Sequence, residues 1–345
     1  MVRSVTYNDT TDDFTITVEN LTEKKVLPPQ TFDYVCVASG HYSTPFTPEY
    51  PGVDTFPGRV MHSHDFRNAK EFAGQRVLLV NFENLTKIFH KILTLKVGSS
   101  YSAEDIACQV IKYGAKKATL SYRTQATGYP WPPNISERPL LTKVDKNTIH
   151  FSDGTQDDFD AIVFCTGYLG HHPFMADNLR CRSPDLLYNA NMYKGIVYTE
   201  GGNGKVLYLG RPTVIYTFTM FDVQAFWSAK YILNEIKAPS KQEMEAQWKA
   251  WYQEGFETLA TRDEILGTIF QTKYCYDLMK ESGFEHEIDL TELIKEWHDD
   301  RVTNGVLTYR DRQFTSLFTK RKSLPVKKPF MENMNHTMES FMAMY

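Results

Sequence analysis

Residues 76–105 have the sequence RVLLVNFENLTKIFHKILTLKVGSSYSAED, in which two parts of one structural unit are separated by an unusual segment. The apolar residues 77–80 predict a buried strand, and residues 98–103 predict a tight turn that opens a helix. In a dinucleotide-binding unit such a strand continues directly into such a turn. Removing residues 81–97 leaves RVLLVGSSYSAEDIA, a well-formed version of that unit, so we interpret them as an insertion.

The insertion leaves two ways to build the strand. Residues 81–96 loop out of the sheet, so that residues 77–80 remain the strand. Alternatively, residues 92–97, ILTLKV, which also have a strand-like pattern, replace it and lead into Gly98. A longer loop costs little by itself, about 0.6 kcal/mol for each doubling of its length. A displaced turn would cost function far more, because binding depends on the position of its backbone groups.

The turn has the spacing of a phosphate-binding glycine motif, GxGxxG/A, with serine in the second glycine position. Its residues are Gly98, Ser99, Ser100, Tyr101, Ser102 and Ala103. The first glycine allows the tight turn, a small second residue lets backbone N–H groups approach a pyrophosphate, and a small last residue lets the helix pack closely on the strand. The start of the helix supplies N–H donors and a positive dipole end. The motif alone is weak, and a capped helix start without a ligand is an equally good interpretation.

The strand predicted over residues 116–124 decides between the two nicotinamide cofactors. It follows a segment, residues 99–114, whose apolar residues lie on one helical face, so the unit is a strand, a helix and a strand. An NAD site usually has Asp or Glu after the second strand, to bind the ribose 2′-hydroxyl. Here Arg123 and Thr124 occupy that place. A guanidinium and a hydroxyl suit a 2′-phosphate, which favours NADP(H); the alternative is a solvated arginine at a strand end.

A repeated phrase indicates a second unit of the same kind. TFDYVCVASGHYS at residues 31–43 and DFDAIVFCTGYLG at residues 158–170 share Phe-Asp, an apolar run, and a small hydroxyl residue followed by glycine. Each follows a hairpin-like pattern, and a tight turn is predicted at residues 152–155 before the second copy. A continuous apolar run that ends in glycine is typical of a parallel central strand beneath a ligand. The repeat predicts two nucleotide-binding modules; the alternative is two unrelated buried strands.

Composition excludes several classes of protein. With a net charge of −4, the chain has no general attraction to nucleic acid or to an anionic membrane surface. No apolar run approaches the ~20 residues of a membrane span, and the first residues do not form a signal peptide. The five cysteines form no CxxC pair and the histidines lack metal-site spacing, so we expect a cytoplasmic protein without a metal. Helical patterns over residues 219–236 and 240–300 predict a helical C-terminal region, whose aromatic part would suit a homodimer interface.

The segment between the two repeats carries the most specific motif. FPGRVMHSHDF places Phe56, Gly58, His62 and Phe66 at the spacing FxGxxxHxxx(Y/F). This pattern, the GxSxSA turn and the CTGY strand end resemble the flavin-containing monooxygenase family, and GSSYSAEDI is most similar to its bacterial trimethylamine monooxygenase branch. Baeyer–Villiger enzymes usually have tryptophan where Phe66 stands, which disfavours ketone oxygenation. The resemblance covers nearly the whole chain, except residues 81–97 and the C-terminal end.

The resemblance implies the cofactors and the chemistry. Members of the family use FAD, NADPH and O2 to oxygenate soft nitrogen or sulfur centres, so the substrate would be a small amine or sulfide. The cofactor carries the chemistry, and no protein nucleophile or metal is required. The glycine turn would hold the NADP pyrophosphate, and Arg123 and Thr124 would hold the 2′-phosphate. Tyr101 and Asp222 would lie near the nicotinamide and the flavin, and His62 would have a structural role.

The sequence departs from the family at the FAD site. Family members begin with a strand and a GxGxxG turn that bind the FAD pyrophosphate, and this sequence contains no such unit. We therefore interpret the chain as N-terminally truncated. The residues left to contact FAD would be Val2, Gly40, Asp222 and Gln224. The alternative is an NADP-binding chain without bound FAD and without catalytic activity. A different flavin enzyme with two dinucleotide folds is disfavoured by the fingerprint and, for a disulfide reductase, by the absence of CxxC.

These observations predict an α/β fold with two dinucleotide-binding, Rossmann-like modules, of which the FAD module is incomplete, and a helical C-terminal region. Residues 56–174, with the insertion at 81–97, would form the NADP-binding domain. Residues 1–55 and 175–345 would form the remnant of the FAD-binding domain and its helical extension.

Overall fold

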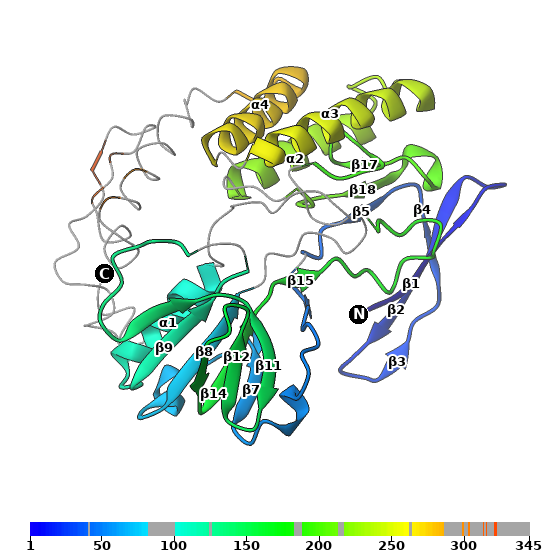
Figure 1. Cartoon of the computed structure of the whole chain (residues 1–345). Helices are drawn as coiled ribbons and strands as arrows, with labels where there is room; N and C mark the ends of the chain where they lie inside the picture. The colour runs from blue at the N-terminus through cyan, green and yellow to red at the C-terminus, as the bar shows by residue number, and fades with distance from the viewer. Residues whose placement is uncertain are drawn as a thin grey trace.

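The fold is mixed α/β, and its elements form two groups (Figure 1). We call residues 53–165 the parallel body, and residues 1–37 together with 188–282 the helical body. The computed structural model describes residues 1–40, 42–81, 101–123, 126–182, 188–212, 217–261 and 264–285, and single residues between 299 and 322.

Five parallel strands form the sheet of the parallel body. In spatial order they are β10 (Ile135–Arg138), β9 (Lys117–Ser121), β8 (Arg76–Asn81), β14 (Ala161–Cys165) and β7 (Arg59–His62). β8 lies in the middle of the sheet, and its residues 77–80 are fully buried. This confirms the interpretation in which residues 77–80 form the strand. Most of the predicted insertion, residues 82–97, lies outside the described residues.

Alternate residues of β8 face opposite sides of the sheet, as the two-residue period of a strand requires. Val77 and Leu79 belong to the core beneath the helix α1, whereas Leu78 and Val80 pack against an antiparallel sheet on the other face. Both faces are therefore covered, which explains why this strand is apolar throughout. The covering elements are α1 (Tyr101–Lys112), β11 (Leu141–Asp145), β12 (Thr148–Phe151) and β13 (Gln156–Asp158). Short 3₁₀ helices of this body are η1 (Val53–Thr55), η2 (Ser63–Asp65) and η3 (Ala69–Phe72).

The structure confirms three local predictions for this body: the apolar face of a helix, the glycine that ends it, and a tight turn. Four residues of α1 form its fully or nearly fully buried apolar face, namely Ala103, Ile106, Ala107 and Val110. The chain leaves the helix at Gly114, whose φ of 96° favours glycine. The predicted tight turn joins β12 to β13, and there the N–H and Oγ1 of Thr155 donate to Oδ1 of Asp153 over 2.9 and 2.6 Å.

Asp157 of β13 ties the antiparallel sheet to the parallel one. Its carboxylate pairs with Arg76 of β8 and, at 2.9 Å, with Lys117 of β9. Burial raises the pKa of Asp157, but the hydrogen bonds from these two cations outweigh burial and hold the pKa at about 2. The charged form of Asp157 therefore stabilises the packing of the two sheets.

We expect Asp157→Asn to reduce the free energy of unfolding by about 1 kcal/mol at neutral pH, allowing for solvent screening of these partly exposed groups. The folded-state pKa lies below the unfolded value of about 3.9, so this stabilisation is present above that value. It is lost as the pH falls from about 4 through about 2. Urea unfolding of both proteins across this range would measure it. A difference that does not shrink with falling pH would contradict the assignment.

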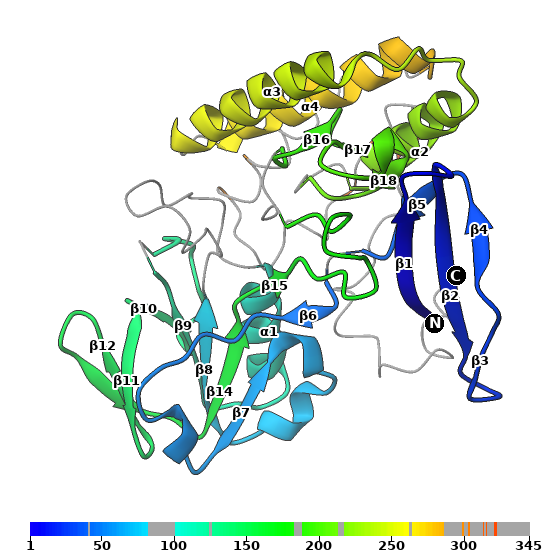
Figure 2. The same ribbon diagram turned by 90° about the vertical axis from the view of Figure 1, so that its right-hand side faces the viewer.

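The helical body contains two sheets of short strands, and three helices lie over one of these sheets. The strands are β1 (Val2–Asn8), β2 (Asp13–Asn20), β3 (Lys25–Val26), β4 (Gln30–Phe32), β5 (Val35–Val37), β16 (Met192–Tyr193), β17 (Val197–Tyr198) and β18 (Val206–Tyr208), with the 3₁₀ helix η4 (Gly202–Gly204) before β18. β5 and β18 are parallel neighbours. The helices α2 (Thr217–Ile232), α3 (Lys241–Thr261) and α4 (Glu264–Ser282) lie over β16–β18, with α3 and α4 side by side (Figures 1 and 2). No helix among the described residues is long and apolar enough to cross a bilayer.

Two connections join the bodies and pair with each other. β6 (Thr44–Pro45) follows β5, β15 (Tyr168–Leu169) follows β14, and the two form an antiparallel pair. The Phe46 N–H donates to the carbonyl oxygen of Gly167 over 2.9 Å, and Oγ1 of Thr166 donates to the carbonyl oxygen of Phe46. The segments that follow the two repeated strands therefore meet between the bodies (Figure 2).

Candidate functional site

The carboxyl ends of the parallel strands form the edge that carries the candidate site. β8 is followed by α1 and then by β9 on one side, whereas β14 lies on the other side. The strand order therefore reverses between β8 and β14, and open parallel sheets bind ligands outside the carboxyl ends at such a point. The last turn of α1 lies at the opposite edge, where the Gly74 N–H donates to the carbonyl oxygen of Gly114 over 2.8 Å. The N-terminus of α1 consequently lies at the carboxyl edge, where helix N–H groups suit an anion.

The second half of the predicted glycine turn is described. Ala103 is fully buried in the core between α1 and the sheet. A small residue at this position allows close helix–strand packing, as the motif requires. Tyr101 and Ser102 are exposed at the helix start. Outside the described residues lie Gly98, Ser99 and Ser100.

Arg123 is exposed just beyond the end of β9, at the same edge of the sheet. Its charge acts on the phenol of Tyr50: burial raises the pKa of Tyr50, and the guanidinium opposes that rise. Tyr50 stacks on Phe164 of β14, with ring centroids 6.2 Å apart. The cation predicted to recognise a 2′-phosphate therefore lies just after the carboxyl end of β9, and its charge reaches a ring that stacks on β14. Thr124 lies outside the described residues.

The fingerprint residues pack the strand β7 into the sheet. A Cβ on Gly58 would overlap the carbonyl oxygen of Asp160 and lie 2.6 Å from the ring of Phe56. Phe56 is buried on the face of the sheet opposite α1. Phe66 stacks on Phe72 on the α1 face, with centroids 5.8 Å apart. The motif thus sets how closely β7 approaches β14, and it does so with residues on both faces.

His62 links the fingerprint to the CTGY strand end. Its Nδ1 accepts the N–H of His64 over 3.0 Å and so caps η2. Its ring meets the edge of Tyr168, with centroids 5.2 Å apart. Burial lowers the pKa of His62, which keeps the ring neutral and able to accept this hydrogen bond. The arrangement supports the structural role that the resemblance implied for His62.

Three of the four residues predicted to contact FAD are exposed: Gly40, which follows the first segment of the helical body, and Val2 and Asp222 within that body. Gly40 follows β5 with a φ of 72°, as Gly167 follows β14 with a φ of 76°, so the two repeated strands end alike. No described heavy atom lies within 4 Å of the Cβ position of Gly40, so the backbone is open there. Val2 lies in β1 and Asp222 lies in α2, and both are exposed.

Gln224 has a different environment, because it is fully buried within α2. Its Oε1 accepts the Gly210 N–H over 2.7 Å, and its Nε2 donates to Oη of Tyr274 over 2.7 Å. Tyr274 in turn donates to the carbonyl oxygen of Lys194 over 2.8 Å. The amide of Gln224 therefore fixes the end of β18 relative to α4, and its influence on a ligand would pass through Gly210.

Two residues near the site were not predicted from the sequence. Arg211 follows β18 and is only 2% exposed, and a Cβ on Gly170 would lie 2.8 Å from its Nη2. A guanidinium is thus packed against the connection that follows β15. Glu137 of β10 accepts hydrogen bonds from the chain that follows Arg123. An arginine directly after a strand-ending glycine is visible in the sequence, but its packing partner is not.

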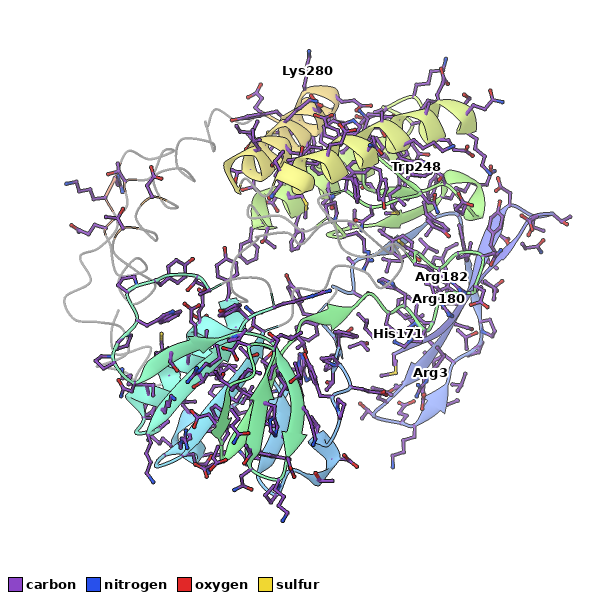
Figure 3. The ribbon with its side chains drawn as sticks, viewed as in Figure 1. Arg3, His171, Arg180, Arg182, Trp248 and Lys280 are labelled. Carbon is purple, nitrogen blue, oxygen red and sulfur yellow. The ribbon has the colours of Figure 1, made fainter. Side chains whose placement is uncertain are left out.

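A pocket of about 500 Å³ lies elsewhere, beside the segment that leads from the connections to β16. Arg180 and Arg182 line it, and Figure 3 shows them towards the N-terminal sheet, away from the carboxyl edge of the parallel body. Both arginines pair with Asp177, at 3.1 and 3.0 Å. The pocket is therefore separate from the candidate site. Among the described residues, no cluster of three or more His, Cys, Asp and Glu side chains is placed to hold a metal ion.

Comparison with known proteins agrees with this arrangement of motifs. A family model described as flavin-binding monooxygenase-like matches residues 5–136 and 132–278. The chain belongs to this family. The resemblance drawn from the fingerprint, the turn and the CTGY strand end is thereby confirmed, and this flavin-containing monooxygenase is classed as an oxidoreductase and a flavoprotein.

Two trimethylamine monooxygenases are among the relatives of this flavin-containing monooxygenase. That of Methylocella silvestris is 42% identical over 345 residues, which cover 99% of this chain and 71% of the relative. The crystal structure of Tmm from Pelagibacter sp. strain HTCC7211 has a TM-score of 0.86 at 38% identity, covering 99% of this chain and 72% of that chain. S-allyl-L-cysteine S-oxygenase from Allium sativum shares the fold, with a TM-score of 0.72 at 24% identity over 90% of this chain and 67% of that one.

Proposed function

We propose that this flavin-containing monooxygenase uses FAD, NADPH and O2 to N-oxygenate a small tertiary amine, with trimethylamine as the first candidate. The observation that carries the proposal is the carboxyl edge of the parallel body, where α1 begins after β8 and Arg123 follows the neighbouring parallel strand β9. The names of the relatives at 42% and 39% identity support the amine substrate. Oxygenation of sulfides by this chain stays a prediction, which dimethyl sulfide would test in the same assay.

The residues of the parallel body fit NADP(H). We infer that residues 56–174 are the NADP-binding domain, a Rossmann-like module. The pyrophosphate would lie at the start of α1, where Ala103 allows close packing and backbone N–H groups suit an anion. Arg123, together with Thr124, would hold the 2′-phosphate. The exposed position of Tyr101 at the helix start suits a contact with the nicotinamide half of the cofactor.

The helical body fits one side of an FAD site. Residues 1–55 and 175–345 would form this second module. The open backbone at Gly40, the exposed Asp222 of α2 and the exposed Val2 are available to contact the flavin nucleotide. Gln224 would act indirectly, by fixing Gly210 at the end of β18. Because β6 and β15 pair between the bodies, the two cofactors would meet there.

When bound, FAD would supply the oxygen-transfer chemistry and NADPH the reducing equivalents. The chain contributes binding and position rather than a nucleophile. Arg123 would hold the nicotinamide cofactor, and the paired connections β6 and β15 join the two modules. His62 and Tyr168 keep the strand ends of the parallel body in place beside those connections. Misplacement by about 1 Å at such a junction costs catalysis roughly 100-fold.

The purified chain tests the proposal in two steps. Flavin absorption bands, present after purification or appearing on titration with FAD, are expected first. We then expect oxidation of NADPH coupled to the formation of trimethylamine N-oxide, dependent on O2. A flavin-containing protein that oxidises NADPH without making the N-oxide would overturn the substrate. A protein that binds no flavin at any FAD concentration would overturn the monooxygenase activity of this chain.

The second candidate function is NADP(H) binding without FAD and without catalysis. One observation favours it: in the described part of the chain, the complete strand–helix–strand unit is β8, α1 and β9, while β5 and β18 are parallel neighbours far apart in the sequence. Calorimetric titration separates the two functions. Binding of NADP⁺ with no heat and no spectral change on adding FAD would support the second function.

A further inference from the structure

The chain that carries Arg123 returns to the edge strand β10, which holds it from both sides. Before Arg123, the N–H of Tyr122 donates to the carbonyl oxygen of Arg138 over 2.8 Å and so continues the ladder between β9 and β10. After Arg123, the next described contacts are made with the side chain of Glu137, also in β10. The chain is therefore bound to β10 on both sides of Arg123, at Tyr122 and at Thr127.

Glu137 accepts three hydrogen bonds from this returning chain. Its Oε1 accepts from both the N–H and the Oγ1 of Thr127, each over 2.8 Å. Its Oε2 accepts from the N–H of Gly128 over 3.3 Å, where a φ of 70° favours glycine. The Oγ1 of Thr127 also accepts the N–H of Tyr129 over 3.4 Å. One carboxylate thus organises a turn that no helix or strand holds.

The negative charge of Glu137 is unexpected near the carboxyl edge of the parallel sheet, which we propose to bind a phosphate. A carboxylate near the site repels a bound 2′-phosphate, and such repulsion weakens affinity. An acid is useful here only if its hydrogen bonds matter more than its charge. Bonds from neutral donors to an ionised acceptor contribute about 1.5–3 kcal/mol each, and Glu137 is half-buried, so they are partly shielded from water. The balance of these two effects favours a structural role for Glu137, in which it supports the chain that carries Arg123.

We propose that Glu137 is a positioning residue for the 2′-phosphate of NADP(H). It holds the turn at Thr127 and Gly128 and thereby keeps Arg123 at the carboxyl edge of β9. The inference rests on the proposed function, because it assigns a supporting role to the residue that would recognise the 2′-phosphate. Fixing the backbone beforehand lowers the ordering cost that the ligand must otherwise meet.

Calorimetric titration of the purified full chain with NADP⁺ and with NAD⁺ tests the role without requiring turnover. Glu137→Ala removes all three acceptor contacts and is expected to weaken NADP⁺ binding about 10-fold, with NAD⁺ affected less than about twofold. Glu137→Gln keeps one carbonyl oxygen for Thr127 and loses the contact with Gly128. We expect it to weaken NADP⁺ binding about threefold.

Three further variants make the result specific. Glu71→Ala removes an exposed acid that pairs with Arg59 on β7, at the other edge of the sheet, and should change neither affinity. Thr127→Val removes the hydroxyl that donates to Glu137 and accepts the N–H of Tyr129. It is expected to weaken NADP⁺ binding about twofold, so it and Glu137→Gln carry the test if Glu137→Ala does not fold. In an Arg123→Ala background, Glu137→Ala should cause no additional loss, because the two residues act as a unit.

The outcomes separate this inference from the proposed function. Equal weakening of NADP⁺ and NAD⁺ by Glu137→Ala would overturn the positioning role and leave Glu137 a general structural residue. If Arg123→Ala weakens NADP⁺ selectively but the Glu137 variants do not, the inference alone fails. If Arg123→Ala leaves the preference for NADP⁺ over NAD⁺ unchanged, the cofactor assignment fails, and the inference fails with it.

Discussion

Arg123→Glu is expected to weaken the binding of NADP⁺ by about 100-fold or more, while the affinity for NAD⁺ changes by less than about threefold. The substitution removes a charge-assisted contact to the 2′-phosphate, which contributes about 1.5–3 kcal/mol. It also places a carboxylate near that phosphate, and two like charges about 4 Å apart repel by up to about 4 kcal/mol at a protein surface. NAD⁺ lacks the phosphate and so avoids both penalties. Calorimetric titration of the purified chain with each nucleotide measures the difference.

Lys112→Glu provides a matched control. It makes the same change of charge on the same module, but Lys112 is exposed at the C-terminal end of α1, at the opposite edge of the sheet. We expect it to change neither affinity by more than about twofold, because charges that far apart are screened by salt. Arg123→Lys keeps a cation without the planar fork and should lose about 10-fold for NADP⁺. Equal effects of Arg123→Glu on NADP⁺ and NAD⁺ would exclude recognition of the 2′-phosphate by this residue.

The parts of the molecule that could be predicted are those set by residues adjacent in sequence. The run at 77–80 predicted a central strand because parallel strands covered on both faces are apolar throughout. The helical spacing of apolar residues placed Ala103 on the buried face of α1. The turn at 152–155 followed from the short-range bonding of Asp153. In each case the pattern and the contact involve the same short segment.

The rest depends on contacts between segments far apart in the chain. Gln224 is a polar residue in a helix, and only the fold shows that its amide is shared between Gly210 and Tyr274. Arg211 looks like a surface cation in the sequence but packs against the connection at Gly170. Glu137 lies in an edge strand, and nothing local indicates that it organises the chain after Arg123. The type of a residue shows which hydrogen bonds or ion pairs its side chain can form. Only the tertiary packing determines which partner it forms them with.

Gly58→Ala is expected to reduce the free energy of unfolding by about 3 kcal/mol and to lower the Tm by roughly 4 °C. The added Cβ would overlap the carbonyl oxygen of Asp160 and crowd the ring of Phe56 at 2.6 Å. The backbone of Asp160 cannot move away cheaply. Its N–H donates to the carbonyl oxygen of Arg76 over 2.9 Å, and its carboxylate accepts the Arg76 N–H over 2.8 Å. Thermal and urea unfolding of the two proteins measure the loss.

Gly267→Ala is the control that separates contact from backbone freedom. Gly267 lies inside α4 with no heavy atom within 4 Å of its Cβ position, so the same substitution should stabilise the protein by about 0.5–1 kcal/mol. The opposite sign is expected at Gly58 because the cost there arises from a close approach of β7 to the start of β14. A shift of that strand would also move His62 relative to Tyr168 and thereby disturb the junction between the bodies. If Gly58→Ala unfolds at the same temperature as the parent chain, glycine is not needed for this packing. The close approach of these two strands would then not explain the glycine of the fingerprint.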